Sequence, residues 1–148
     1  MEAISRPSPS IDKLITRFQR ADRELRLEAL LDASRKLPAL PEHLARDQAR
    51  EAHRVTECQT PVFLWFEGDS AQVRIFADVP RESPTVRGFV SLLVGALDGA
   101  PAAEIAELPA DLIGLLKLDE TLGMMRSQGL GAVVRRFRRA GAERRSPA

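Results

Sequence analysis

The sequence predicts an α+β fold in which a small antiparallel β-sheet packs against helices. Residues 61–66, PVFLWF, mix β-branched and aromatic side chains without helical spacing, and residues 71–77 form a second such run after turn residues at 68–70. Before and after this hairpin, apolar residues recur with the period of a helix. Because strands and helices occupy separate stretches of the chain, the pattern favours segregated layers.

The length and charge of the chain limit its organisation. A chain of 148 residues suits one domain, which buries about two thirds of its unfolded surface. We expect this domain at residues 10–140, between flexible tails at 1–9 and 141–148. The net charge of +1 argues against nucleic acid or a membrane surface as partner. The longest nearly apolar run, 88–97, is too short for a bilayer span, so the sequence predicts a cytoplasmic protein.

Two helices are expected before the hairpin. Ser10 can cap the first, and the apolar residues of that helix share one face: Ile11, Leu14, Ile15 and Phe18. Asp22 can cap the second, which Pro38 and Pro41 prevent from continuing. Its expected inward residues are Leu27, Leu30, Leu31 and Leu37. Its expected outward residues are Arg23, Glu24, Arg26 and Glu28. The charged stretch 42–51 predicts an exposed turn of helix and a loop.

The hairpin follows a short polar loop that carries the only cysteine. Pro61 cannot donate a hydrogen bond to a neighbouring strand, so it marks the first residue of the first strand. Residues 53–56 are a candidate third, antiparallel strand. The loop of residues 57–60 then presents Cys58 at the end of the sheet.

Helices are expected after the hairpin. Ser83 caps a helix with Pro84 in its first turn and an apolar stripe of Val86, Val90, Leu93 and Leu97. Gly88 and Gly95 share a face of this helix, which favours close packing against the hairpin or the Cys58 loop. Short helices are expected at 101–107 and 109–116, and a last helix at 124–140.

The last helix carries a run of arginines that is expected to face outward: Arg135, Arg136, Arg138 and Arg139. No aromatic residues interleave with them, as a nucleic-acid surface would require. The run therefore predicts a solvated face or a patch for an acidic protein partner.

A single cysteine excludes an internal disulfide and, with His43 and His53, supplies too few converging ligands for a zinc site. Two interpretations of Cys58 stay open: a buried structural thiol, which is common, and an accessible nucleophile among polar neighbours. His53 could pair with Cys58 and lower the pKa of the thiol, but no third orienting group is evident. With no phosphate loop, paired carboxylates or pyridoxal-lysine context, no cofactor is expected.

Four segments together resemble one known family. ECQTPVFL at 57–64 resembles the persulfide-accepting cysteine loop of the SufE family of cysteine desulfuration proteins. VRGF at 86–89 is similar to a helix start in that family, RSQGL at 126–130 to its Arg-Ser-x-Gly-Leu segment, and LPALP at 37–41 to its breaker before the cysteine segment. Order and spacing agree over residues 11–139. Glu57 departs from the glycine that many members carry, and its charge would raise the pKa of a nearby thiol.

The resemblance implies a SufE/IscU-like fold and a function in sulfur transfer. Cys58 would accept sulfur as a persulfide from a pyridoxal-phosphate-dependent cysteine desulfurase of the SufS type, activate that enzyme and pass sulfur to an iron-sulfur scaffold complex of the SufBCD type. The chain itself would not be an enzyme. Arg126 would support Cys58, by docking or by stabilising the thiolate. The residues expected to bind the partner are Glu82, Gln59, Gly88 and Arg126.

Two other function classes remain alternatives, a thiol-independent interaction adaptor and a cysteine-based hydrolase. A persulfide is labile to small thiols and oxidants, so a carrier benefits from keeping it covered. We therefore expect Cys58 to be sheltered at rest, beside Val55, Val62 and Phe63, and to be exposed by the partner.

Overall fold

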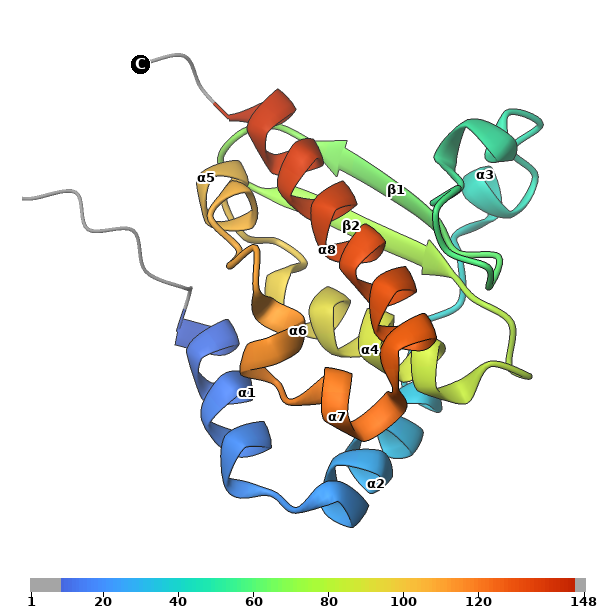
Figure 1. Cartoon of the computed structure of the whole chain (residues 1–148). Coiled ribbons are helices and arrows are strands. Elements are labelled where there is room, and N and C mark those ends of the chain that lie inside the picture. Colours follow the sequence, from blue (N-terminus) through green and yellow to red (C-terminus); the bar gives the residue numbers. More distant parts are fainter. Residues whose placement is uncertain (1–8, 146–148) are drawn as a thin grey trace, which may run out of the picture.

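The computed structural model describes residues 9–145 and confirms the α+β class. Strands β1 (Phe63–Gly68) and β2 (Val73–Asp78) form a two-stranded antiparallel sheet. The helices are α1 (Pro9–Arg20), α2 (Arg23–Ser34), α3 (Glu42–Ala45), the 3-10 helix η1 (Arg50–His53), α4 (Pro84–Leu97), α5 (Ala102–Ala106), α6 (Leu112–Leu115), α7 (Leu118–Leu122) and α8 (Met124–Arg144). In Figure 1, α8 crosses the hairpin diagonally, while α1 and α2 lie at the end of the molecule away from it.

Both faces of the hairpin are buried. Alternate side chains of a strand point to opposite faces, so Leu64 and Ile75 join the main core, whereas Phe63 and Trp65 form a smaller cluster with Leu44. Helix α8 covers the main-core face, where the Phe66 ring contacts the Phe137 ring edge-on at 5.3 Å. The segment that contains α3 and η1 covers the other face. The sheet therefore lies between two layers of chain.

The expected third strand at 53–56 is wrong. Only Arg54 forms an isolated bridge with Phe63, and the backbone N–H of Val55 donates to the carbonyl of Val62 at 2.8 Å. The 3-10 helix η1 occupies the preceding residues and the chain turns directly afterwards, so no room is left for a ladder.

The face assignment of α2 needs two corrections. Asp22 caps α2 as expected, accepting from the backbone N–H of Leu25 at 2.8 Å. Arg26, however, is buried and donates to the carbonyl of Phe18 and to the hydroxyl of Thr121, both at 3.1 Å. Leu31, expected inside, is 36% exposed. The polar acceptors from α1 and α7 draw the arginine inward and turn the other edge of α2 to solvent.

Helix α4 starts where expected and packs against α2. A Cβ added at Gly88 would lie 2.0 Å from the carbonyl oxygen of Leu30, so only glycine permits this approach. Arg87 reinforces the junction by donating to the carbonyls of Ser34 at 2.8 Å and Val79 at 2.5 Å. The close neighbour is α2 rather than the hairpin or the Cys58 loop. Gly95 differs from the expectation, because no atom of residues 9–145 lies within 4 Å of an added Cβ.

The boundaries of the domain differ from those expected. Helix α1 already begins at Pro9. Helix α8 runs to Arg144, which donates hydrogen bonds to the carbonyls of Phe66 and Gly68. Residues 141–144 therefore belong to the domain and not to a tail. The remaining parts of the expected tails, 1–8 and 146–148, lie outside the described residues. Within residues 9–145, no helix combines the length and apolar character needed to cross a membrane.

Candidate functional site

The cysteine lies in a loop whose two ends are fastened to each other. The hydrogen bond from Val55 to Val62 closes residues 56–61 into a loop at the end of the sheet, and both valines are buried. Within the loop, the N–H of Cys58 donates to the carbonyl of Val55 at 3.2 Å. The loop can therefore rearrange between fixed ends without breaking the pairing of β1 with β2.

Cys58 is sheltered, as expected, with 5% of its surface exposed and its side chain in the main core. The element that covers it is α8, not the glycine face of α4. A Cβ added at Gly129 would lie 3.1 Å from Cys58 Sγ, which is closer than Cβ atoms normally approach a neighbour. Gly129 thus lets the start of α8 lie against the thiol. The signal in the sequence is the glycine of RSQGL, and it lies on a different helix from the expected one.

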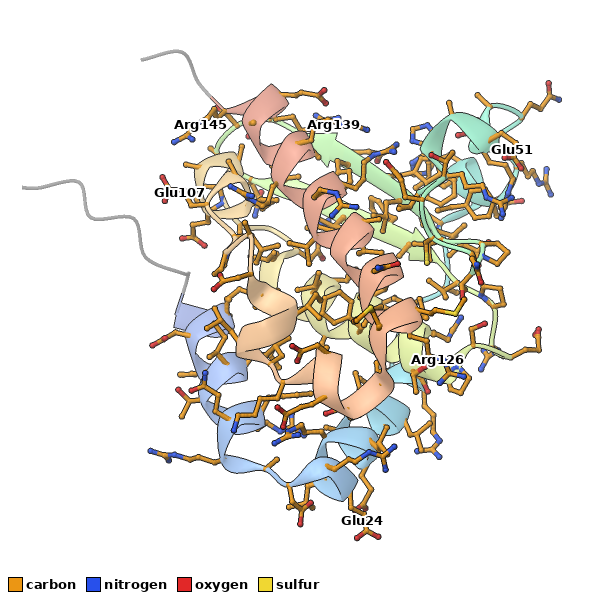
Figure 2. The ribbon with its side chains drawn as sticks, in the orientation of Figure 1. Glu24, Glu51, Glu107, Arg126, Arg139 and Arg145 are labelled. Atoms are coloured by element: carbon orange, nitrogen blue, oxygen red, sulfur yellow. The ribbon has the colours of Figure 1, made fainter. Side chains whose placement is uncertain are left out.

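A hollow of about 360 Å³ opens beside the thiol and brings several candidate residues together. Cys58, Gln59 and Arg126 all line it, with Val86 of α4 on one side. Gln59 and Arg126 are exposed, and among residues 9–145 the Arg126 guanidinium forms no ion pair. Figure 2 shows Arg126 at the beginning of α8. A cation is therefore available at the mouth of the hollow.

An exposed methionine that the motifs do not include, Met125, lines this hollow, and Met124 directly precedes it. Met124 and Met125 are 75% and 72% exposed, and Met125 lines the hollow. The two consecutive methionines directly before Arg126, in the first turn of the helix expected at 124–140, are the sequence signal that points to them. Flexible thioether side chains of this kind adapt to irregular partner surfaces.

The resting state disfavours the thiolate. Burial raises the pKa of the Cys58 thiol, while a hydrogen bond from the backbone of Thr60 and the positive charge of Arg54 act in the opposite direction and only partly offset it. The carboxylate of Glu57 is not among the groups that shift this pKa. It is exposed and accepts a long hydrogen bond of 3.4 Å from the hydroxyl of Thr56. The sheltered thiol is thus protonated and weakly nucleophilic at neutral pH.

The structure does not form the histidine and cysteine dyad. The His53 ring stacks on the Trp65 ring at 5.3 Å and lies 3.7 Å from Asp47, within the cluster on the other side of the hairpin. His43 instead contacts Glu67 at 3.1 Å. In the described part of the chain, no group of three or more His, Cys, Asp or Glu side chains converges as metal ligands would. A hydrolase mechanism at Cys58 therefore lacks its proposed base.

The remaining candidates lie elsewhere. Glu82 is exposed in the turn between β2 and α4 and does not line the hollow. Gly88, expected to bind the partner, is instead buried inside the α2–α4 junction and does not line the hollow.

Arg136, which was assigned to the solvated face, is half-buried and fastens α8 to the segment before the cysteine loop. Its guanidinium donates to the carbonyls of Ala52 at 3.2 Å and Arg54 at 3.4 Å. Burial and the charge of Arg139 lower the pKa of Arg136, partly offset by Glu143 and Glu57, but a guanidinium stays charged.

Comparison with known proteins places this site in a family. The family model described as "SufE: Fe-S metabolism associated domain" matches residues 12–141. An uncharacterised SufE-like protein of Mycobacterium tuberculosis is 38% identical over 136 residues, covering 91% of this chain and 92% of that protein. The sulfur acceptor protein CsdE of Escherichia coli is 35% identical over 106 residues, covering 70% of this chain and 68% of CsdE.

A solved structure shares the fold of this chain. The solution structure of a hypothetical protein from Thermus thermophilus superposes with a TM-score of 0.78 at 29% identity, covering 93% of this chain and 97% of that one. The family match spans the helices, the hairpin and the cysteine loop described above. The chain therefore belongs to the SufE family.

Proposed function

We propose that this protein is a sulfur acceptor that carries sulfane sulfur on Cys58. The observation that carries the proposal is the placement of the only cysteine in a loop with fastened ends, under Gly129 and beside the exposed Arg126. Membership of the SufE family and similarity to a protein named as a sulfur acceptor support the same chemistry.

The transfer requires only one nucleophile from this chain. The Cys58 thiolate attacks the outer sulfur of a persulfide on the partner, and the sulfur-sulfur bond of that persulfide breaks. The partner leaves as a thiolate and Cys58 becomes the persulfide, so no external oxidant or reductant is consumed. The positive charge of Arg126, at the mouth of the hollow, can stabilise the anionic groups that meet there.

The donor in this proposal is a pyridoxal-phosphate-dependent cysteine desulfurase of the SufS type. Removing sulfur from that enzyme frees its cysteine for another turnover, which is how a carrier activates it. The sulfur then passes to an iron-sulfur scaffold complex of the SufBCD type. Such exchange suits the reducing cytoplasm, where a lone thiol stays free.

Loading requires the thiol to leave its shelter. At rest the raised pKa and the cover of α8 keep Cys58 unreactive. Turning the side chain outward rearranges only residues 56–61 and exposes a small apolar group, which we estimate at about 1 to 3 kcal/mol. A docking interface readily supplies that much. Docking thereby raises the reactivity of Cys58 at the moment of transfer.

A mass measurement tests the acceptor role. We expect the protein, mixed with a purified SufS-type desulfurase and free cysteine, to gain the mass of one sulfur atom on Cys58. Cys58→Ser is nearly isosteric, so this variant should fold normally but gain no sulfur and give no stimulation. Full stimulation of the desulfurase by the serine variant would instead identify an adaptor that works without the thiol.

Alkylation tests the shelter separately. Iodoacetamide should modify Cys58 of the free protein slowly and should modify it faster when the desulfurase is present without cysteine. A Cys58 that alkylates as fast as free cysteine, with or without the partner, would contradict the gating step and leave the acceptor role standing.

A further inference from the structure

A second hollow, of about 600 Å³, lies between α1, α2 and α4 and plays no part in the chemistry of Cys58. It shares no lining residue with the hollow beside Cys58. In Figure 1 the helices α1 and α2 that border it lie at the end of the molecule away from the hairpin. Its volume falls within the range of small-molecule sites in proteins.

Gly95 keeps this hollow deep. Glycine weakens a helix interior relative to alanine, and Gly88 in the same helix is explained by its close approach to α2. Gly95 has no such neighbour, since an added Cβ would meet nothing within 4 Å. Packing among residues 9–145 therefore does not account for Gly95. Its missing side chain leaves open space above a floor that includes Leu14 and Val94.

A serine side chain lies in the same hollow. Ser91 is only 8% exposed and lines it from α4. Among residues 9–145 its side chain makes no hydrogen bond. The hydroxyl oxygen is not among the fully buried polar atoms, so it reaches the space of the hollow and can donate to or accept from a ligand there.

The rim of the hollow is cationic. Lys13 and Arg17 lie one turn apart on α1, and neither forms an ion pair within the described residues. Lys36 stands at the rim too and is held by Asp32 at 2.9 Å. The one lining carboxylate, Asp98, is already engaged by Arg74 at 3.0 Å and by the backbone N–H of Ile75 at 2.9 Å. The rim can therefore bind a negatively charged group of a ligand.

We propose that this hollow binds a small amphiphilic organic anion, with its anionic group between Lys13 and Arg17 and its apolar body on the floor beside Gly95. The lining runs over Ser10 to Arg17 on α1 and Ser91 to Asp98 on α4, which is about two helical turns or roughly 10 Å. This length suits a medium-chain acyl carboxylate. The Ser91 hydroxyl provides the one polar contact within the floor.

Octanoate and octanol are matched probes for an NMR titration of the isotope-labelled full chain. Octanoate should give saturable shifts centred on the amides of Ser91 and Gly95, with a dissociation constant of about 1 mM or lower. Octanol has the same apolar chain without the charge and should bind at least roughly threefold more weakly, because exposed cations contribute modestly.

Variants localise the site. Gly95→Leu should fill the hollow and remove the shifts, while the gain of sulfur on Cys58 stays unchanged. Lys13→Gln with Arg17→Gln should weaken octanoate roughly threefold to tenfold and leave octanol unaffected. Both cations are exposed, so this double variant remains folded even if leucine at 95 perturbs α4. Leu25→Ser removes exposed apolar surface outside the hollow and is the control. This variant should bind octanoate with unchanged affinity and show the same amide shifts.

Several results would overturn the proposal. Shifts that fail to saturate, or that centre on Leu25 or on Met124, would place the probe on ordinary apolar surface. Equal affinity for octanoate and octanol would show that the negative charge of the ligand does not contribute to binding, which contradicts the proposal of an anion site. If the protein binds octanoate but gains no sulfur on Cys58, the ligand proposal stands and only the sulfur-acceptor proposal is contradicted. The two proposals can therefore be tested separately.

Discussion

Gly88 and Gly129 both let a helix approach a neighbour closely, and the difference lies in what the neighbour is. At Gly88, an added Cβ would meet the backbone of Leu30 at 2.0 Å. At Gly129 it would meet the sulfur of Cys58 at 3.1 Å, a single side chain on a loop. A contact with helix backbone cannot open without moving a whole element, whereas a contact with one side chain can.

The rest of the molecule supports this division. The α2–α4 junction is further held by Arg87, which donates to carbonyls at the end of α2 and after β2. The Cys58 loop is held at its ends by Val55 and Val62 and lacks regular structure between them. The first glycine contact thus lies against helix backbone, and the second lies against the side chain that must move in the proposed function.

The largest effect is expected for Gly88→Ala. The new methyl group would overlap the Leu30 carbonyl, which belongs to helix backbone and cannot rotate away. We expect a loss of about 3 kcal/mol or more in the free energy of unfolding, measured by urea denaturation. The folded fraction should still accept sulfur on Cys58.

Gly95→Ala is the matched control in the same helix. With open space around its Cβ, alanine should stabilise α4 by about 0.5 to 1 kcal/mol. Equal destabilisation by both variants would show that steric overlap with α2 is not the cause.

The sequence predicted much of this fold because local patterns specify it. The hairpin follows from its strand-like runs, although both strands begin two residues later than expected. The helix at 84–97 follows from its apolar period and from Pro84 in its first turn, although the Ser83 side chain forms no capping hydrogen bond. The predictions that were wrong concern residues whose position depends on contacts between segments far apart in the sequence. Arg26 is inside because the Phe18 carbonyl and the Thr121 hydroxyl receive it, and α7 supplies one of those groups. No local sequence pattern predicts hydrogen-bond acceptors that lie on a distant helix.

The site shows the same limit. The motifs point to Cys58, Gln59 and Arg126, and all three line one hollow, although their roles remain proposals. The lability of a persulfide predicts a sheltered thiol, and Cys58 is 5% exposed. The covering helix was assigned wrongly, because the Gly88 and Gly95 pair in one helix resembled a packing face more than the single Gly129 did. Arg136 was placed in solvent because an arginine run gives no hint that one member reaches backbone carbonyls before the loop.

The second prediction tests the movable contact. Gly129→Ala should change the free energy of unfolding by no more than about 1 kcal/mol, because the sulfur can yield and alanine favours the helix. The alanine methyl group also crowds the Cys58 sulfur and so destabilises its sheltered position. If this destabilisation is about 1 kcal/mol, the rate of alkylation of Cys58 should increase roughly fivefold.

Gly131→Ala controls for helix propensity in α8. The nearest atom to its added Cβ is the flexible end of Arg135 at 3.5 Å, so alkylation should not change. Destabilisation by Gly129→Ala as large as that by Gly88→Ala would remove the distinction between the two contacts.

A smaller effect is expected from pH. Burial raises the pKa of Cys58 in the folded state above that of the unfolded thiol. Its contribution to stability is then complete below the unfolded pKa, roughly 8.5, and is lost as the pH rises from there through the folded pKa. Relative to Cys58→Ser, the wild type should lose stability in urea denaturation between roughly pH 8 and pH 10. An identical pH dependence of both proteins would show that the thiol is not held in its neutral form.

The smallest effect on stability is expected for Arg126→Ala. The side chain is exposed and forms no ion pair within the described residues, so the free energy of unfolding should change by less than about 0.5 kcal/mol. Its charge nevertheless lies at the hollow beside Cys58, where the partner would bind in the proposed function. Acceptance of sulfur should therefore slow, and Arg126→Lys should restore part of it because the charge returns without the planar guanidinium. Arg23→Ala, an exposed arginine in the first turn of α2, should leave both quantities unchanged. A steep loss of stability at Arg126 with unchanged acceptance per folded molecule would assign the residue a structural role instead of a role in the proposed function.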